Sequence, residues 1–222
     1  METLTLQAID GGRVRAFVAR PEGEPKGCVL VVQEIFGVND HVRWVATEQF
    51  AQAGWLAVAP AFFDRIESGV ELGYGPDGFA RGRALVAELG TDAPLRDLRA
   101  AQRQVAGDLP TGVVGYCWGG TIAFLAATRL GLPAVGYYGA RTAAFVHERL
   151  QAPCVLHFGE LDAHIPIDTV RSISRAQPQV PCHLYPAGHG FNRHGHADWH
   201  EDSAQTALAR TLGFLAQHLR DE

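Results

Sequence analysis

No hydrophobic run in the sequence is long enough to cross a membrane. The longest apolar stretches, residues 29–32 and 122–125, are far shorter than the ~20 residues that a spanning helix needs. The segment METLTLQAIDGG at the start also lacks the basic and apolar regions of a secretory signal peptide. We therefore expect a cytoplasmic protein with no membrane partner.

Runs of basic residues are absent as well. The formal net charge is −5 at pH 7, and Lys and Arg form no cluster along the chain. Proteins that bind nucleic acids normally carry a basic patch or stripe, so we expect no nucleic-acid partner. Any functional positive charge must then act locally.

Cysteine is scarce and irregularly spaced. The 4 cysteines form no C-x-x-C pair, which argues against a disulfide framework and against a zinc ribbon. Cys28, Cys154 and Cys182 each open a predicted strand, where we expect small buried hydrophobic side chains. Cys117 needs a separate explanation.

The composition that remains is that of an ordinary globular protein, with 47% hydrophobic and 19% charged residues. A chain of 222 residues can still enclose one hydrophobic core, so we predict a single domain over residues 1–222.

Short apolar runs alternate with helical patterns, which is typical of an α/β fold with a mostly parallel sheet and helices on both faces. Buried strands are predicted at residues 28–33, 55–59, 112–116, 134–138, 155–158 and 182–185. Two further runs, 4–9 and 14–19, flank Asp10-Gly11-Gly12 and predict an antiparallel hairpin at the edge of the sheet.

Apolar residues at helical spacing predict helices at residues 41–53, 95–105, 121–129 and 198–219. Gly54 suits the left-handed position that ends the first of these. Residues 67–78 are too rich in glycine for a helix or a strand, so we predict a loop there that lines a site.

The sequence Gly-Tyr-Cys-Trp-Gly-Gly at residues 115–120 follows a predicted strand and precedes a predicted helix. This is the nucleophile-elbow pattern of α/β-hydrolases, with Cys117 as the nucleophile. Glycine is needed two residues either side because a side chain there would collide with neighbouring backbone. The N-terminus of the following helix favours the thiolate. This context disfavours the alternative, an unreactive buried cysteine in a glycine-rich turn.

In α/β-hydrolases the acid and the histidine follow the nucleophile in that order. Asp162 and His189 both stand just beyond the carboxyl ends of predicted strands, where an open α/β sheet places its ligand site. We therefore predict a triad of Cys117, Asp162 and His189, with Glu160 as an alternative acid.

Three more histidines follow closely, His194, His196 and His200. Their spacing could suggest a metal site, but no compact carboxylate or cysteine cluster accompanies them. We expect them to be solvated loop residues and expect no metal.

Glu34 and Ile35 stand at the end of the predicted strand 28–33. In the hydrolase fold this connection supplies one oxyanion-hole N–H group, and the residue after the nucleophile supplies the other. The predicted donors are the backbone N–H groups of Ile35 and Trp118. Taken alone, Glu34 could equally cap the next helix.

Together with Gly-Glu-Leu-Asp at 159–162 and His-Gly-Phe-Asn-Arg at 189–193, these motifs resemble the dienelactone hydrolase (carboxymethylenebutenolidase) family over essentially the whole chain. The resemblance implies an α/β-hydrolase fold, with an eight-stranded, mostly parallel sheet that begins in an antiparallel hairpin. It also implies catalysis by Cys117, Asp162 and His189, with Glu34 helping to deprotonate the thiol when substrate binds.

The resemblance further implies that two arginines hold a substrate carboxylate. Arg193, four residues after His189, matches one of them, and Arg65 is the best match for the other, with an ordinary surface arginine as the alternative. A planar guanidinium can hold a carboxylate through two charge-assisted hydrogen bonds. Tyr137 and Tyr138 end a predicted strand, and we place Tyr137 at the substrate, although aromatic residues more often pack in the core.

We therefore predict a carboxylic ester hydrolase of the carboxymethylenebutenolidase type, which opens a carboxylate-bearing lactone such as dienelactone through a thioester acyl-enzyme. The predicted enzyme needs no cofactor, acts on a small molecule and is a monomer. Two alternatives stay open: an esterase or thioesterase for neutral substrates, and a non-catalytic thiol sensor in which Cys117 is oxidised. The acid and the histidine argue against the sensor, which does not need them.

Overall fold

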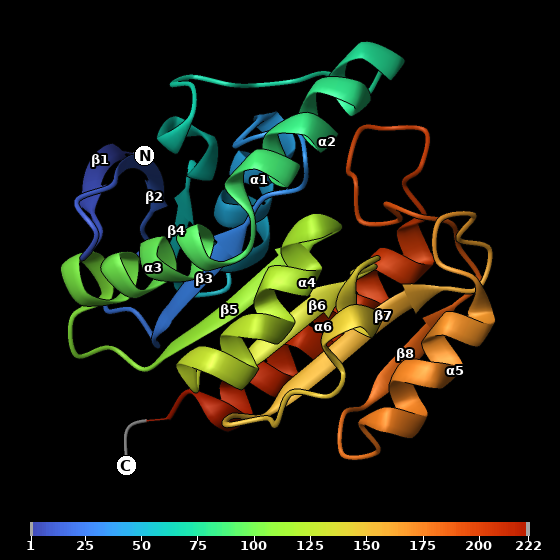
Figure 1. The fold of residues 1–222 in the computed structure, drawn as a ribbon. Coiled ribbons are helices and arrows are strands. Elements are labelled where there is room, and N and C mark those ends of the chain that lie inside the picture. Colours follow the sequence, from blue (N-terminus) through green and yellow to red (C-terminus); the bar gives the residue numbers. More distant parts are fainter. Residues whose placement is uncertain (1, 221–222) are drawn as a thin grey trace. The chain divides into compact units, whose positions relative to one another are not determined.

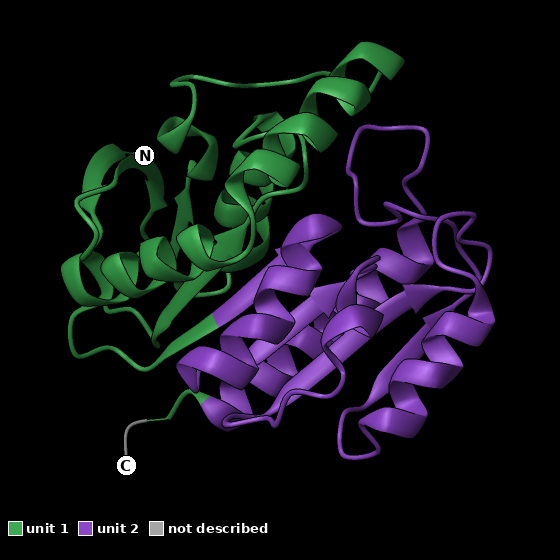
Figure 2. Ribbon diagram, viewed as in Figure 1, with its two compact units in different colours: residues 1–112, 219–222 green, residues 113–218 purple. Residues whose placement is uncertain are grey.

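The computed structural model describes residues 2–220. By their contacts the residues form two compact units, 1–112 with 219–222 and 113–218 (Figure 2). The single domain over residues 1–222 remains a prediction. Each unit is built around one half of the strands.

The first unit contains the strands β1 (Glu2–Gln7), β2 (Arg13–Ala19), β3 (Cys28–Val32) and β4 (Leu56–Pro60). They lie in the order β1-β2-β4-β3. β1 and β2 form an antiparallel hairpin, β2 is also antiparallel to β4, and β3 is parallel to β4. The predicted hairpin is therefore confirmed, and its turn holds Gly11 at φ +82° while the Gly12 N–H donates to the Asp10 carboxylate.

The second unit contains β5 (Thr111–Tyr116, from residue 113 onward), β6 (Ala134–Tyr137), β7 (Cys154–Gly159) and β8 (Cys182–Tyr185). These strands follow one another in the order of the chain, and every neighbouring pair is parallel. Figure 1 shows α4 (Trp118–Leu125) in front of these strands and α6 (Glu201–His218) behind them. Both faces of this half are thus covered, as the apolar strand runs predicted.

The remaining helices are α1 (Asp40–Trp44), α2 (Pro76–Leu89), α3 (Asp92–Ala101) and α5 (Ile167–Ala176), with short helical segments η1 (Val45–Ala51), η2 (Phe62–Arg65), η3 (Gln102–Ala106), η4 (Ala126–Leu130) and η5 (Thr142–Phe145). The four predicted helices are all present, three of them as an α-helix that runs on into a π-helical turn. Gly54, after the first, has the expected positive φ, +92°. Within residues 2–220, no helix combines the length and apolarity needed to span a membrane.

The prediction for residues 67–78 is partly wrong, because α2 begins at Pro76. Gly75 precedes it in an extended conformation, and a proline at the first helical position has the right φ and no N–H to leave unsatisfied. The rest of the segment is irregular, apart from a bridge between Glu71 and Gly37.

Two of the three other cysteines, Cys28 and Cys154, have the buried side chains that were predicted, whereas Cys182 is less buried than predicted. Cys28 and Cys154 are buried and Cys182 is half-buried. Burial raises the pKa of the Cys28 thiol to about 12 and that of Cys182 to about 11. These thiols therefore stay protonated and unreactive at neutral pH.

Candidate active site

The backbone at Cys117 has the strained conformation of a nucleophile elbow. Cys117 joins β5 to α4 with φ 55° and ψ −119°, a region that residues other than glycine rarely adopt. Its N–H donates to the Tyr137 carbonyl at 3.0 Å, and its carbonyl accepts from the Gly120 N–H at 2.9 Å. Such strain costs about 1–3 kcal/mol and persists only where the surroundings impose it.

The glycines around Cys117 are required for steric reasons. A Cβ on Gly115 would lie 1.9 Å from the Gly119 carbonyl oxygen, and one on Gly120 would lie 2.6 Å from that of Tyr137. Both distances are far below van der Waals contact, so the elbow can form only with glycine at these positions. For Gly115, two residues before Cys117, this is the steric reason that the sequence pattern predicted.

Asp162 and His189 come from the loops after β7 and β8. The His189 Nδ1 atom lies 2.8 Å from Oδ2 of Asp162. The other carboxylate oxygen, Oδ1, accepts the backbone N–H groups of His164 at 2.8 Å and Ile165 at 3.1 Å. The carboxylate is therefore fixed by its own loop, and it fixes in turn the orientation of the imidazole.

The charges around His189 favour the imidazolium. Burial of the ring lowers its pKa, but the negative charge of Cys117, hydrogen bonds with Asp162 and Cys117, and the charge of Asp162 outweigh burial and raise the pKa to about 10. Cys117 and His189 thus interact directly, and both belong to the second unit. An imidazolium next to a cysteine stabilises the thiolate.

His189 makes two contacts with other aromatic rings. Tyr138, whose φ is 40°, lies with its ring 5.0 Å from the imidazole, and His164 meets the imidazole edge-on at 5.1 Å. Tyr138 directly follows β6, and only its position at a strand end signalled a place near the site. Nothing in the sequence distinguishes His164 from a solvated loop histidine.

The alternative site residues are not part of this arrangement. Glu160 is exposed, whereas Asp162 is buried against His189. His194 packs on Trp199 at 5.2 Å, and the His196 imidazole lies beside Asp198. Among residues 2–220, no three His, Cys, Asp or Glu side chains converge in a way that could hold a metal.

Arg193 is buried in the loop that follows His189. Its Nη1 atom donates to Oδ2 of Asp198 at 2.6 Å, and the guanidinium lies against Gly190, where a Cβ would approach Cζ to 2.7 Å. Gly190 has φ +76°. Gly190 therefore leaves room for the guanidinium in the loop that follows His189, and no sequence pattern pointed to Asp198 as its partner.

The structure corrects the prediction for Arg65. Its Nε and Nη2 atoms each donate at 2.8 Å to the buried carboxylate of Asp97, and its Nη1 and Nη2 atoms donate at 3.0 Å to Asp10. Two carboxylates thus occupy the guanidinium in a fork-to-fork arrangement. Arg65 links α3 to the turn between β1 and β2, a structural role that leaves no open donor edge for a substrate.

The prediction for Tyr137 also needs correction. The side chain is fully buried, and its hydroxyl lies 2.7 Å from the hydroxyl of Thr211 on α6. Its ring packs on His157 at 4.7 Å. Tyr137 is therefore a core residue with a satisfied hydroxyl, as aromatic residues at strand ends often are.

Glu34 and Ile35 belong to the first unit, immediately after β3 and Gln33. Both are buried, with 1% and 5% of their surface exposed. A carboxylate this deeply buried at the carboxyl end of a central strand is uncommon without a function or a partner. Their predicted roles stay predictions.

The comparison with known protein families decides the assignment. The model of the dienelactone hydrolase family matches residues 14–219. The chain belongs to the dienelactone hydrolase family. It is a hydrolase, and the carboxymethylenebutenolidase class of carboxylic ester hydrolases fits it.

Relatives named as carboxymethylenebutenolidases align along nearly the whole chain. The carboxymethylenebutenolidase of Pseudomonas putida is 30% identical over 227 residues, which cover 97% of this chain and 96% of that protein. A protein of Azospirillum brasilense named "Putative carboxymethylenebutenolidase" is 34% identical over 231 residues, 99% of this chain and 100% of that one.

A solved structure supports the dienelactone hydrolase fold. The crystal structure named "Putative Dienelactone Hydrolase", from Klebsiella pneumoniae subsp. pneumoniae, has a TM-score of 0.82 and 32% identity, covering 98% of this chain and all of that one. The predicted fold, an α/β-hydrolase with eight strands, a mostly parallel sheet and an antiparallel N-terminal pair, is confirmed.

Proposed function

We propose that this family member is a cysteine-dependent hydrolase that opens a carboxylate-bearing lactone such as dienelactone. The observation that carries the proposal is the arrangement of Cys117 at a strained elbow, interacting with His189, which Asp162 orients. A thiolate, an imidazolium and a buried carboxylate in this order are the parts of an acyl-transfer triad.

In the first half of the proposed reaction, the Cys117 thiolate attacks the lactone carbonyl carbon. The carbonyl oxygen becomes an oxyanion, for which the backbone N–H groups of Trp118 and Ile35 are the proposed donors. The ring C–O bond then breaks, and the leaving oxygen takes the proton of the His189 imidazolium. The product of this half is a thioester between Cys117 and the opened chain.

In the second half, neutral His189 takes a proton from water as the water oxygen attacks the thioester carbon. The C–S bond breaks, the Cys117 thiolate is released, and the imidazolium is restored. Throughout both halves Asp162 keeps Nδ1 protonated, so that Nε2 is the atom that exchanges the proton. Neither half of the proposed reaction needs a metal or an organic cofactor.

Where Cys117 is still a thiol when substrate binds, the proposed role of Glu34 is to take the thiol proton, as in the dienelactone hydrolase family, so that the attack starts from the same thiolate. Burial of the Glu34 carboxylate supports a functional role, since a side chain that is only 1% exposed cannot serve solubility. Arg193 is the proposed partner of the substrate carboxylate, because it is buried and follows His189 by four residues. Arg65 and Tyr137 have no part in the proposed site.

The test is hydrolysis of dienelactone beside p-nitrophenyl acetate by the parent protein, Cys117→Ala and Arg193→Gln. We expect Cys117→Ala to lower kcat for both substrates by about a thousandfold or more. Arg193→Gln should raise KM for dienelactone by about tenfold or more and leave the neutral ester nearly unchanged. Arg171→Gln, on the exposed face of α5, is the matched control.

Each result separates the candidate functions. Hydrolysis of the neutral ester alone, with no effect of Arg193→Gln, would show an esterase or thioesterase and overturn the lactone. Full activity in Cys117→Ala would overturn the mechanism. Absence of all turnover despite a reactive thiol would favour a thiol sensor. The cytoplasmic location and the monomeric state stay predictions. Cell fractionation can check the first and gel filtration the second.

A further inference from the structure

The backbone that follows Glu34 is held at four consecutive residues by a single distant segment and one arginine. Residues 35–38 form the connection from β3 to α1, here called the oxyanion loop. Residues 69–82, which lead into and include the first half of α2, are here called the strap. Both belong to the first unit.

The contact at Ile35 is made by Gly82 of α2. A Cβ on Gly82 would lie 2.1 Å from the carbonyl oxygen of Ile35 and 3.2 Å from its Cβ. The helix therefore touches the Ile35 peptide directly, and only a glycine allows this approach. Ile35 is the residue whose N–H group the proposed mechanism uses.

The next two residues are held by backbone contacts. The Phe36 carbonyl accepts the Leu72 N–H at 2.9 Å, and Gly37 forms an antiparallel bridge with Glu71. A Cβ on Gly37, whose φ is +83°, would lie 2.1 Å from the Val70 carbonyl oxygen. The strap thus runs along the oxyanion loop like a short extra strand.

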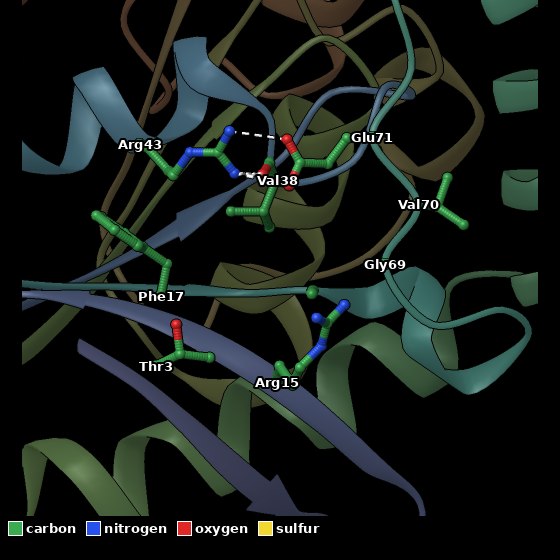
Figure 3. A pocket seen from close by; sticks show the side chains of 9 residues that line it. Thr3, Arg15, Phe17, Val38, Arg43, Gly69, Val70 and Glu71 are labelled. Atoms are coloured by element: carbon green, nitrogen blue, oxygen red, sulfur yellow. Dashed lines mark hydrogen bonds and ion pairs between the residues drawn. The ribbon is translucent and has the colours of Figure 1, made fainter. Parts of the chain in front are cut away.

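The fourth residue, Val38, is held through an ion pair. Arg43 donates from Nη1 to the Val38 carbonyl at 2.6 Å and to Oε1 of Glu71 at 2.9 Å, while Nη2 donates to Oε2 of Glu71 at 2.7 Å. One guanidinium therefore joins the end of the oxyanion loop to the strap (Figure 3).

A small hollow lies beside the ion pair between Arg43 and Glu71. A hollow of about 120 Å³ is lined by Val38 and Arg43 together with the strap residues Gly69, Val70 and Glu71 (Figure 3). The Arg43–Glu71 ion pair is therefore a directional contact that holds the strap beside this hollow. Since Arg15 and Arg43 already pair with Asp64 and Glu71, the cavity has no surplus of positive charge for an anion.

We propose that the strap is a positioning element of the reaction, which fixes the backbone of the oxyanion loop and with it the Ile35 N–H, a proposed donor to the oxyanion. The inference rests on the proposed function. Donors of an oxyanion hole act because they are fixed before the charge develops, and a displacement of about 1 Å can cost about a hundredfold in rate. Gly82 and Glu71 are accordingly positioning residues.

The test is Gly82→Ala, because the added methyl must displace the Ile35 carbonyl. We expect kcat for p-nitrophenyl acetate to fall by about tenfold or more, with KM within about twofold of the parent value. The matched control is Gly213→Ala in α6, where an added Cβ meets nothing within 4 Å. The control should keep the parental kcat.

Two further measurements separate positioning from general damage. Alkylation of Cys117 by iodoacetamide forms no oxyanion, so its rate should stay within about twofold in Gly82→Ala. A trifluoromethyl ketone, which forms a tetrahedral adduct with the thiolate, should bind more weakly by the same factor as the loss in kcat. Parental kcat in Gly82→Ala, or alkylation that slows in parallel with hydrolysis, would overturn the proposal.

Glu71→Gln is a milder variant that keeps the test decisive if Gly82→Ala does not fold. It removes the ion pair but retains the shape, so kcat should fall by about twofold to fivefold, again without a change in alkylation. Its control is Glu67→Gln, just before the strap, which removes an exposed ion pair with Arg81 of the strap. A Cys117→Ala protein that still hydrolyses the ester would refute the proposed function instead.

Discussion

The imidazole of His189 and the carboxylate of Asp162 are joined by a hydrogen bond of 2.8 Å between Nδ1 and Oδ2. Asp162→Asn keeps the shape of this contact but presents a neutral group, which no longer fixes the tautomer or stabilises the imidazolium. We expect kcat to fall by about a hundredfold to ten-thousandfold. Glu160→Gln, at the exposed acid two residues earlier, should leave kcat unchanged, and a comparable loss in both variants would contradict the assignment of the acid.

The charge of Cys117 should be visible in the titration of His189. A nearby negative charge favours the protonated imidazole, and it is the largest contribution that raises this pKa to about 10. In Cys117→Ala that contribution is lost while burial remains, so the pKa should fall. NMR titration of the His189 ring protons measures the change. Cys154→Ala, which removes another buried thiol, should leave the titration as it is.

Arg65 should matter for stability rather than for substrate binding. Arg65→Met leaves the fully buried Asp97 carboxylate without its guanidinium, and breaking a buried ion pair in this way costs about 3–5 kcal/mol. Burial already raises the pKa of Asp97, and Arg65 lowers it; without Arg65 the pKa rises further. Because the folded state then favours the protonated acid, stability is lost as pH rises, and the deficit should grow from pH 5 to pH 8.

Urea unfolding at the two pH values measures this deficit. Arg20→Met, which breaks an exposed pair with Glu2, should change the free energy of unfolding by less than about 1 kcal/mol. If Arg65→Met instead raised KM for an anionic substrate at unchanged stability, Arg65 would be a substrate-binding residue and not a structural one.

Asp198 should tune the preference for anionic substrates. Its carboxylate accepts a hydrogen bond from Nη1 of Arg193 at 2.6 Å. It therefore competes with a substrate carboxylate for the Arg193 guanidinium. Asp198→Asn removes that charge, and KM for a carboxylate-bearing lactone should fall by about threefold to tenfold, while KM for a neutral ester stays the same. Asp168→Asn, in an exposed pair on α5, is the control. Equal changes for both substrates would argue against a carboxylate contact at Arg193.

Much of the fold could be predicted because the strands carry a strong signal. Strands such as β3 and β5 are buried on both faces, so their sequences are almost continuously apolar. The helices α2 and α5 escaped prediction for the opposite reason. α5 buries only Val170 and Ile173, and α2 buries Gly82, Leu85 and Val86, of which the glycine carries no hydrophobic signal.

The candidate site shows the same division between local and distant information. The elbow at Cys117 and the acid Asp162 could be predicted from short continuous sequence motifs, since tight turns restrict the residue types of their neighbours. The partners of Arg65 lie 32 and 55 residues away, at Asp97 and Asp10. No local sequence pattern reveals such distant pairs. For this reason Arg65, which has structural partners, was predicted to bind a substrate carboxylate.

The left-handed backbone at Cys117 also bears on how this family changes over time. Glycine would occupy that turn with less strain than any residue that carries a nucleophile, so selection for turnover alone opposes its replacement there. In a lineage that no longer needs the activity, this position should drift to glycine while the surrounding strands stay apolar. Under the proposed mechanism, a change from cysteine to glycine at this turn would therefore mark a descendant that has lost the activity.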